Sequence, residues 1–434
     1  MRKIIIFVVL TFMASINADD QVIAQTAGAW DGLDAAREHI ETNRKGDLTV
    51  IVCDRKGNPV PNAKVVVTMN RHAFPFGSCI NVVYAFNEDG PKPEAEQYLK
   101  VFVENFNAAV VENSMKWTGF SDADGNANTT RRAQVRQCMD WLDDHDIELR
   151  GHNVLWPNWQ FAPKYLKDLS PDRLRDTIYH RIDEAILFCR GRLTDWDLVN
   201  EPAHHRAFMD ILGEEEVVYW YRRAHELDPG TPMYVNQYDV LNGDYHSEYK
   251  RWIELLIDGD SPLGGIGIQG HVKTDQFIGE ENLEKVWNIL NEYAAYGLPI
   301  KITEFDCEAT NGEDRQAECL ENALTLFFSH PSVEGFMLWG FWDGRHWRNT
   351  ERYGLDKAGL WCEDWSEKPA AQTWRRLIFK EWRTNETVMT NIDGRATVRG
   401  FLGDYRIVVD IPGGHRNVLC KITRSGNEIS VTMP

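Results

Sequence analysis

Two glutamates stand out because each follows a strand-like segment. Glu201 lies in WDLVNEP (residues 196–202) and Glu304 lies in ITEFD (residues 302–306). Each segment is a short β-branched run that comes after a helical pattern and a turn, so each carboxylate is expected where a buried parallel strand ends. Two carboxylates at the rim of one barrel indicate hydrolysis of a glycosidic bond.

That chemistry needs two carboxyl groups with different tasks. One must carry a proton for the leaving oxygen near neutral pH, and the other must stay ionised to attack the anomeric carbon. Asn200, beside Glu201, is placed to contact the sugar 2-hydroxyl. Asp306 and His271 are candidates to orient or ionise Glu304, although Asp306 also fits an ordinary loop carboxylate.

Eight apolar runs, each ending in a polar or aromatic residue and separated by amphipathic helical patterns, follow one another along the chain. They are FPFGSCIN, NAAVVEN, IELRGHNV, DWDLVNE, PMYVNQ, GIGIQGH, IKITEF and GFMLWG, between residues 74 and 340. Strands that alternate with helices pair in parallel, and eight of them predict an α/β fold, the closed (β/α)8 TIM barrel. An open doubly wound sheet is the alternative, but the chain lacks its glycine-rich phosphate loop.

The residues that end these runs are the candidates for the working face of the barrel. They are Asn81, Glu112, Asn113, His152, Asn200, Glu201, Asn236, Gln269, His271, Glu304 and Trp339. Any single member also fits a helix cap or a loop contact. Four indoles near strand ends, Trp117, Trp156, Trp339 and Trp347, are placed to stack on sugar rings, whereas Trp141, Trp252 and Trp287 lie in helical patterns and are expected in the core.

The flanks of the barrel differ in pattern. Residues 1–18 resemble a secretory signal, with Arg2 and Lys3 before a short apolar core; an uncleaved membrane anchor is the alternative. Residues 19–45 are expected to form a linker or helix. Residues 46–73 alternate around the turn DRKGNP and predict a hairpin, residues 74–383 the catalytic barrel, and residues 384–434 a second small β element. We expect both β elements to stabilise the barrel and to lie away from the cleft.

The composition limits the classes of molecule that this protein can bind. The 434 residues carry a net charge of −19, which disfavours nucleic acid and anionic membranes and favours a neutral polymer.

The eight cysteines form no CxxC pair, and the sequence leaves their disulfide pairing open, including that of Cys307 with Cys319. The adjacent His204 and His205 do not have metal-ligand spacing, so we expect no metal and no cofactor. We expect a secreted monomer that stays off the membrane once the signal is removed.

Seven sequence motifs along the predicted barrel resemble those of glycoside hydrolase family 10, the endo-1,4-β-xylanases. They are VVENSMKW, RGHNVLW, WDLVNEP, YVNQY, GIGIQGH, ITEFD and LWGFWDGRHW, in the family's order over residues 74–382. The resemblance implies that Glu201 is the acid/base and Glu304 the nucleophile of a retaining mechanism. It also implies sugar-binding roles for Glu112, Asn113, Lys116, His152, Trp156, Gln269, His271, Trp339 and Trp347. Asn200, Asn236 and Tyr238 are further candidates for contact with the substrate.

Four positions depart from the family pattern. Pro157 and Asn158 stand where the family usually continues with His-Ser, Gln237 replaces an acidic residue, and Ser114 replaces Glu or Ala.

Two other functions stay open. A β-1,4-glucanase or mixed-specificity glycanase uses the same barrel, and a carbohydrate-binding protein without catalysis is the alternative from another class. Retention of both glutamates with Asn200 and His271 disfavours the latter.

Overall fold

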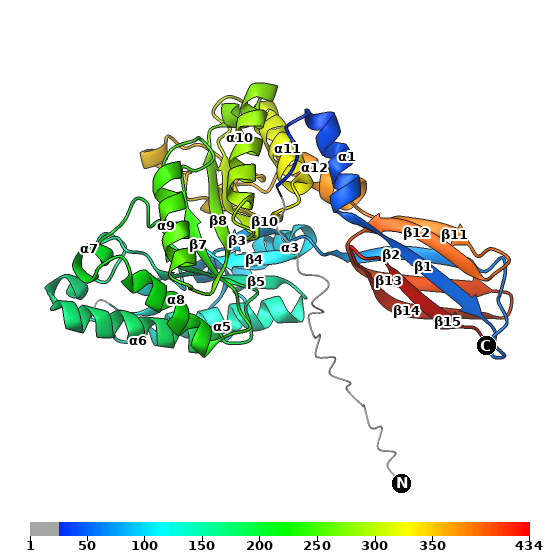
Figure 1. Ribbon diagram of the computed structural model, residues 1–434, viewed down its shortest axis with the longest axis horizontal. Coiled ribbons are helices and arrows are strands. Elements are labelled where there is room, and N and C mark those ends of the chain that lie inside the picture. Colours follow the sequence, from blue (N-terminus) through cyan, green and yellow to red (C-terminus); the bar gives the residue numbers. More distant parts are fainter. Residues whose placement is uncertain (1–25, 123) are drawn as a thin grey trace, which may run out of the picture.

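The computed structural model describes residues 26–122 and 124–434. The predicted signal (1–18) and the first residues of the predicted linker therefore lie outside the described residues. The described chain forms two bodies, a large barrel surrounded by helices and a flat β-sandwich beside it (Figure 1). Among the described residues, no helix is long and apolar enough to cross a membrane.

Eight parallel strands close into a barrel in the order β10-β3-β4-β5-β6-β7-β8-β9. All eight runs predicted from the sequence are strands of this barrel. Their bounds are β3 (Phe76–Ile80), β4 (Ala108–Val111), β5 (Glu148–Leu155), β6 (Trp196–Asn200), β7 (Met233–Gln237), β8 (Leu263–Val272), β9 (Ile300–Cys307) and β10 (Val333–Leu338). The (β/α)8 fold is thus confirmed.

Helices follow the strands and cover the barrel, as Figure 1 shows. The α-helices are α1 (Leu33–Asn43), α2 (Val82–Ala85), α3 (Glu96–Asn105), α4 (Trp117–Phe120), α5 (Thr129–Asp144), α6 (Pro171–Cys189), α7 (Met209–Leu212), α8 (Glu216–Leu227), α9 (His246–Asp258), α10 (Glu280–Ala294), α11 (Glu313–Ser329) and α12 (Pro369–Arg376). Short 3₁₀ turns are η2 (Pro93–Ala95), η3 (Lys164–Asp168), η4 (Thr274–Phe277), η5 (Asp343–Arg345) and η6 (Glu351–Tyr353), and one π turn is η7 (Leu377–Glu381).

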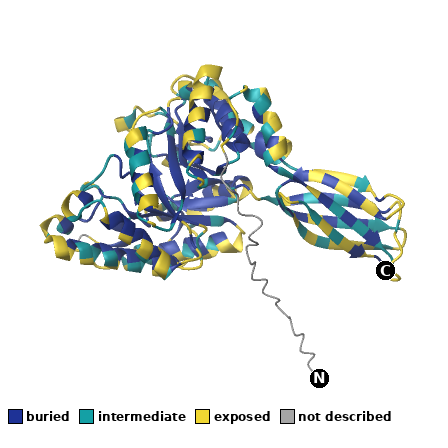
Figure 2. Cartoon of the chain, in the orientation of Figure 1, coloured by how far each residue is buried: buried dark blue, intermediate teal, exposed yellow. Residues whose placement is uncertain are grey.

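Helix α6 illustrates why these segments are helical. Pro171 occupies the first turn, where its missing N–H costs nothing, and Ile178, Ile182 and Ile186 recur at helical spacing on the buried face. Burial in Figure 2 alternates in the same way around the barrel, with buried strands inside and helices exposed on their outer sides. The strands are therefore held between two apolar surfaces, which fixes the position of the residues at their ends.

The terminal β elements form one sandwich of two sheets. One sheet has the order β12-β1-β15 and the other β11-β2-β13-β14. The bounds are β1 (Lys45–Cys53), β2 (Lys64–His72), β11 (Asn385–Met389), β12 (Arg395–Phe401), β13 (Gly403–Ile411), β14 (Gly414–Ile422) and β15 (Asn427–Thr432). The two ends of the chain thus contribute strands to the same two sheets, with alternating burial along each strand (Figure 2).

The predicted hairpin over residues 46–72 is wrong. β1 pairs with β12 and β15, whereas β2 pairs with β11 and β13 in the other sheet. An alternating pattern specifies which face of a strand is buried but not which strand is its partner. The buried sides of both strands enter one core between the sheets, and residues 54–63 carry the chain from one sheet to the other.

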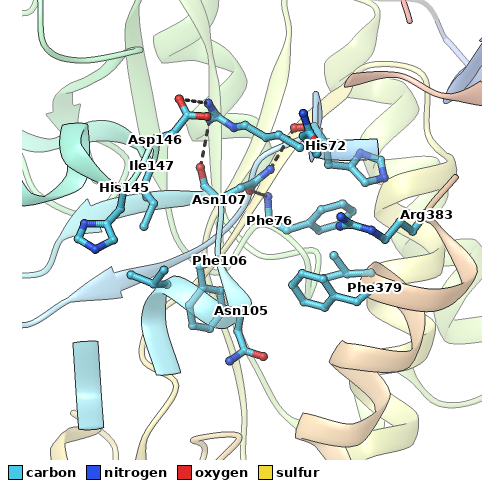
Figure 3. Close-up of a pocket in the computed structure, with 14 residues that line it drawn as sticks. His72, Phe76, Asn105, Phe106, Asn107, His145, Asp146, Ile147, Phe379 and Arg383 are labelled. Atoms are coloured by element: carbon cyan, nitrogen blue, oxygen red, sulfur yellow. Dashed lines mark hydrogen bonds and ion pairs between the residues drawn. The ribbon is translucent and has the colours of Figure 1, made fainter. Parts of the chain in front are cut away.

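A cavity of about 190 Å³ lies where the sandwich meets the barrel (Figure 3). Its lining includes His72, Phe76, Asn107 and Ile147, which lie at or next to the N-terminal ends of β3, β4 and β5. The Asn107 amide donates to the carbonyls of His72 and Phe74 (both 3.1 Å) and accepts from Phe76 N–H (2.7 Å). Such contacts at the N-terminal face stabilise a barrel, and catalysis belongs to the opposite rim.

The eight cysteines, all in the described part of the chain, are free thiols. Cys307 and Cys319, whose pairing the sequence left open, are both buried and interact as side chains without a disulfide. No cysteine therefore constrains the loops at the catalytic rim.

Candidate active site

Glu201 leaves strand β6 in a left-handed backbone conformation, with φ of 60°. Its N–H donates to the carbonyl of Asn236 (2.7 Å), and its carbonyl accepts the N–H groups of His204 (3.1 Å) and His205 (2.9 Å). A glutamate rarely adopts this conformation unless its surroundings enforce it, and such strain is concentrated at functional sites. The turn therefore directs the Glu201 side chain and two histidines to the same place.

The carboxyl group of Glu201 is surrounded by neutral hydrogen-bond donors. Its Oε1 accepts from Asn200 Nδ2 and from Gln269 Nε2, both at 3.1 Å. Its Oε2 accepts from the indole N–H of Trp156 at 2.8 Å and lies 3.2 Å from His205 Nε2. Only 7% of the residue is exposed, so these contacts replace water.

Glu304 has a charged environment instead. It lies in β9 and is 4% exposed, with His271 Nε2 at 3.4 Å from its Oε2 and His152 Nδ1 at 3.8 Å from its Oε1. Burial by itself raises the pKa of Glu304, but His152 and the hydrogen bond and charge of His271 outweigh burial and lower this pKa to about 2. Glu304 is therefore a carboxylate at any pH at which the protein works.

Asp306 supports this arrangement from behind. It accepts from His271 Nδ1 (3.0 Å), from the indole N–H of Trp347 (2.7 Å) and from Arg348 Nη1 (2.8 Å). Burial lowers the pKa of His271, but Asp306 on one side and Glu304 on the other outweigh it and raise this pKa to about 10. A cationic imidazole thus bridges two carboxylates, and these contacts support the orienting role expected for Asp306, which stays a prediction.

A pair of amides joins the two glutamates. Asn236 Nδ2 donates to Asn200 Oδ1 and to Glu304 Oε1, both at 2.8 Å, and Asn200 in turn donates to Glu201. Thr303 Oγ1 donates to Asn236 Oδ1 at 2.7 Å and fixes the orientation of that amide. Glu201 and Glu304 therefore face one space across the Asn200–Asn236 bridge.

The residues after β4 and β5 line one side of that space. Glu112 accepts from Asn81 (2.9 Å) and Asn113 (3.0 Å), and Lys116 donates to Asn113 (2.9 Å). Burial raises the pKa of Glu112, although Lys116 and these amides oppose the shift. The ammonium of Lys116 also lies 5.0 Å above the Trp156 ring, which joins this cluster to the acid site.

The predicted aromatic residues are divided between the site and the core. The His152 ring meets Trp339 edge to face at 4.8 Å, and Lys116 lies 5.6 Å from the Trp339 ring. Trp117 is buried in α4 and packs against Phe208, with 6.2 Å between ring centroids. These contacts favour core packing for Trp117, and its sugar-stacking role stays a prediction.

Tyr238 lies on the other side of the glutamates, after β7. Its ring stacks on His204 at 3.8 Å, and His204 also contacts the ring of Tyr245 at 3.6 Å. All twelve predicted sugar-binding residues thus lie on or just beyond the C-terminal halves of the barrel strands. Their individual roles stay predictions.

Sequence reasoning missed several supporting residues. Asp197 lies beneath His152, with 2.9 Å between Oδ2 and Nδ1, and Arg150 donates to both oxygens of Asp197. The signal for Asp197 and Arg150 was a charged residue inside a buried strand, where it needs a partner. Arg348 and His205 carried no such signal, because both lie in loops without periodicity.

Among the described residues, no group of three or more His, Cys, Asp and Glu side chains is arranged to hold a metal ion. His204 and His205, adjacent in the sequence, contact Tyr238 and Glu201 respectively. The side chains that meet at this rim are carboxyl groups, imidazoles, amides and indoles.

Known proteins with similar sequences point to one family. The profile of Glycosyl hydrolase family 10 matches residues 68–376. The chain is 30% identical over 417 residues to "Anti-sigma-I factor RsgI6" of Acetivibrio thermocellus, which covers 96% of this chain and 51% of that protein. It is 29% identical over 378 residues to "Endo-1,4-beta-xylanase 1" of Arabidopsis thaliana, covering 84% of this chain and 36% of that protein. The chain thus spans about half the length of these relatives or less.

Solved structures share the fold. Native xylanase 10B from Thermotoga maritima superposes with a TM-score of 0.62 at 23% identity, covering 71% of this chain and 96% of that one. Xylanase 10B from Thermotoga petrophila, solved with xylobiose, gives a TM-score of 0.63 at 23% identity. The matched profile spans most of the chain and includes the barrel strands that carry Glu201 and Glu304, so the chain belongs to glycosyl hydrolase family 10.

Proposed function

We propose that this chain is a secreted, retaining endo-1,4-β-xylanase. One observation carries the proposal: two buried carboxyl groups face one space, one held ionised by cationic His271 and the other surrounded by neutral donors. Retaining hydrolysis needs this difference, because one group attacks while the other delivers a proton. The arabidopsis relatives named endo-1,4-beta-xylanases support xylan as the substrate.

The proposed reaction has two displacements. In the first, a Glu304 oxygen attacks the anomeric carbon while the proton of Glu201 passes to the glycosidic oxygen, so the glycosidic bond breaks and a glycosyl ester forms. In the second, Glu201, now a carboxylate, takes a proton from water, the water oxygen attacks the same carbon, and the ester bond to Glu304 breaks. A separation of roughly 5 to 5.5 Å between the two carboxyl groups remains the geometric prediction of this mechanism.

The rigidity of Trp347 supports xylose over glucose. Its indole N–H is bonded to Asp306, and its ring packs edge to face on His271 (4.9 Å) and Tyr353 (4.7 Å). A ring held on three sides does not move aside easily for the hydroxymethyl group that glucose has and xylose lacks. We therefore propose a preference for xylan, and a β-1,4-glucanase is the second candidate.

The test measures reducing ends and viscosity with the purified protein on xylan, on cellulose and on a mixed-linkage glucan. The expected result is fast loss of xylan viscosity with few reducing ends, the signature of internal cleavage. The Glu304→Gln variant is the matched control, because it keeps the shape of the site and lacks the nucleophile. Equal rates on glucan and xylan would replace the proposal by the mixed-specificity alternative.

The non-catalytic alternative gives a different result. A carbohydrate-binding protein would retain xylan without releasing reducing ends, and its affinity would not depend on the Glu201 proton. Secretion is tested separately by expressing the chain with and without residues 1–18 and following its export. Retention of the full chain in the membrane fraction would favour the anchor alternative.

A further inference from the structure

Two of the departures from the family pattern each contact one of the histidines after Glu201. Asn158 Nδ2 lies 3.2 Å from His205 Nε2, and Gln237 Nε2 lies 2.6 Å from His204 Nδ1. Asn158 lies in the loop after β5, the two histidines lie in the loop after β6, and Gln237 is the last residue of β7. Because His205 Nε2 also lies 3.2 Å from Glu201 Oε2, the substitution at position 158 reaches the acid through a single imidazole.

Hydrogen-bond accounting fixes the state of His205. Asn158 Oδ1 accepts the backbone N–H of Gln160 at 2.8 Å, and a backbone N–H can only donate. The other end of the amide, the Nδ2 donor, therefore faces His205. A donor facing Nε2 requires a lone pair there, so His205 is neutral and carries its proton on Nδ1.

The same hydrogen-bond argument applies to His204. The contacts of this ring also hold the loop after β6 in place. Gln237 Oε1 accepts the N–H of Ala203 (3.0 Å), so its amide nitrogen is the end that faces His204. Burial lowers the pKa of His204 to about 4, against the opposing effect of Glu201, so this ring is neutral too. Stacked on Tyr238, it holds the turn that presents His205 to Glu201.

The contacts of Glu201 then locate its proton. Oε1 already receives two amide N–H groups, from Asn200 and Gln269, whereas Oε2 receives one N–H, from Trp156, and faces the lone pair of His205. A lone pair that faces a bare carboxylate is repulsive, and one that faces a carboxyl O–H is a hydrogen bond. The proton of the acid therefore belongs on Oε2.

We propose that Asn158 holds His205 as a neutral acceptor, and that this pair keeps the catalytic proton on Glu201 Oε2 until the leaving oxygen takes it. His205 is a positioning residue in this scheme, and its lone pair is shared between the Asn158 amide and the Glu201 hydroxyl. The proposal rests on the function proposed above and adds how the proton donor is prepared.

The proton balance is simple. When substrate binds, the glycosidic oxygen replaces His205 as the partner of the Oε2 proton; the O–H bond of Glu201 breaks and that of the leaving alcohol forms. Glu201 becomes a carboxylate whose charge is met by the N–H groups of Trp156, Asn200 and Gln269. Water returns the proton in the second displacement, and His205 gains and loses none.

Other charged or titratable groups face this pair and must be kept constant in any test. They are His204 on the same loop, Tyr238 and Asp239 after β7, Lys116 above the Trp156 ring, and Glu304 with His271 across the Asn200–Asn236 bridge. Asp239 Oδ2 is 3.7 Å from His204 Nε2. None of them needs to be changed to alter the state of His205.

The test is Asn158→Asp, a nearly isosteric change. One oxygen of the new carboxylate keeps the Gln160 contact and the other faces Nε2, which must then carry a proton. With carboxyl groups at both positions 158 and 201, His205 is expected to become an imidazolium, as His271 is between Asp306 and Glu304. That cation favours ionised Glu201, so the alkaline limb of the kcat/KM profile is expected to fall by about one pH unit or more. If the new negative charge acted on Glu201 directly and not through His205, it would move this limb upward. The sign of the shift therefore distinguishes the proposed route through His205 from a direct charge effect.

Controls separate the outcomes. The double variant Asn158→Asp/His205→Phe lacks an imidazole to protonate, and its alkaline limb is expected to rise. Cleavage of a dinitrophenyl xylobioside, whose leaving group needs no proton, is expected to show no downward shift. An unmoved or raised limb in the single variant, with an unchanged melting temperature, would overturn the proposal while leaving the xylanase function intact.

Two further results complete the test. If the aspartate variant does not fold, Asn158→Ala removes the donor to Nε2 and is expected to lower the same limb by a smaller amount. If the unaltered protein cleaves neither xylan nor aryl xylobiosides, the proposed function fails, and the proton proposal fails with it.

Discussion

Glu201 and Glu304, the two glutamates proposed as catalytic, lie in contrasting surroundings, although both are almost fully buried in one rim. Glu304 faces a cationic imidazole that Asp306 and, through it, Arg348 hold in place. Glu201 meets two amides, an indole and, by our inference, a neutral imidazole. Burial raises the pKa of Glu304, and the neighbouring imidazoles outweigh it, so charge next to this carboxyl group keeps it ionised.

This difference shows how one barrel separates two identical side chains into two tasks. His271 in β8 and His152 in β5 act on the charge of Glu304, whereas Glu201 accepts from neutral donors, Trp156 after β5, Asn200 in β6 and Gln269 in β8. The Asn200–Asn236 bridge joins the two sets directly. Mutations on one side are therefore expected to change one limb of the pH profile and one step of the reaction.

The largest effect is expected for Glu304→Gln. An amide cannot form the glycosyl ester, so turnover should fall by at least on the order of 10⁴-fold on every substrate, whatever its leaving group. Initial rates on xylan and on a dinitrophenyl xylobioside measure this loss. Rescue of this variant by azide, with a product of inverted configuration, would reverse the roles assigned to Glu201 and Glu304.

Glu201→Ala is expected to have the next largest effect, and one that depends on the substrate. Xylan hydrolysis should fall by about 10²- to 10⁴-fold, the usual contribution of general acid catalysis. The first step on a dinitrophenyl substrate should survive because that leaving group needs no proton, and the second step should slow. A burst of dinitrophenol followed by azide-dependent turnover is the measurement, and equal losses on both substrates would contradict it.

How far the sequence predicts these surroundings depends on where each residue lies. Strand-end residues such as Glu201, Asn236 and Glu304 were found because an apolar run ends beside them, and parallel strands bring such ends to one rim. Asn158 and Gln237 were recognised as departures from a pattern. Their contacts with His204 and His205 were not predicted, since the loops that bring these residues together have no hydrophobic periodicity.

The fold, too, could be predicted from the sequence only where a local pattern specifies it. Eight alternating runs specified the barrel, because parallel strands buried on both sides have few other arrangements. The alternation in β1 and β2 specified only a buried face for each, and the hairpin prediction failed because each strand found its partners beyond residue 384. Partner choice across more than 300 residues depends on the packing of the whole sandwich, which no local pattern contains.

His271→Asn tests the charged side of the comparison. The pKa of Glu304 is about 2 with His271 present, and losing the imidazolium leaves burial to raise it, by about one to three units. Since Glu304 must be ionised to attack, the acidic limb of kcat/KM should move upward, and activity near pH 4 should fall much more than activity at pH 7. The alkaline limb, which belongs to the proton donor, serves as the internal control.

The smallest effect is expected for Trp156→Phe, which tests the neutral side. The phenyl ring keeps the stacking partner Phe161, 3.9 Å away, and loses only the N–H that Glu201 Oε2 accepts. A hydrogen bond to a charged group contributes about 1.5 to 3 kcal/mol, so kcat/KM on substrates with poor leaving groups should fall by about tenfold or somewhat more.

For Trp156→Phe, the direction in which the pH profile moves is more informative than the size of the rate change. The lost N–H stabilised ionised Glu201, so the alkaline limb should move upward while the acidic limb, set by Glu304, stays in place. The dinitrophenyl xylobioside is the control, because a change in sugar binding would lower its kcat/KM as well. A shift of the acidic limb in Trp156→Phe, or of the alkaline limb in His271→Asn, would mean that the Asn200–Asn236 bridge couples the two glutamates so strongly that they titrate as one unit.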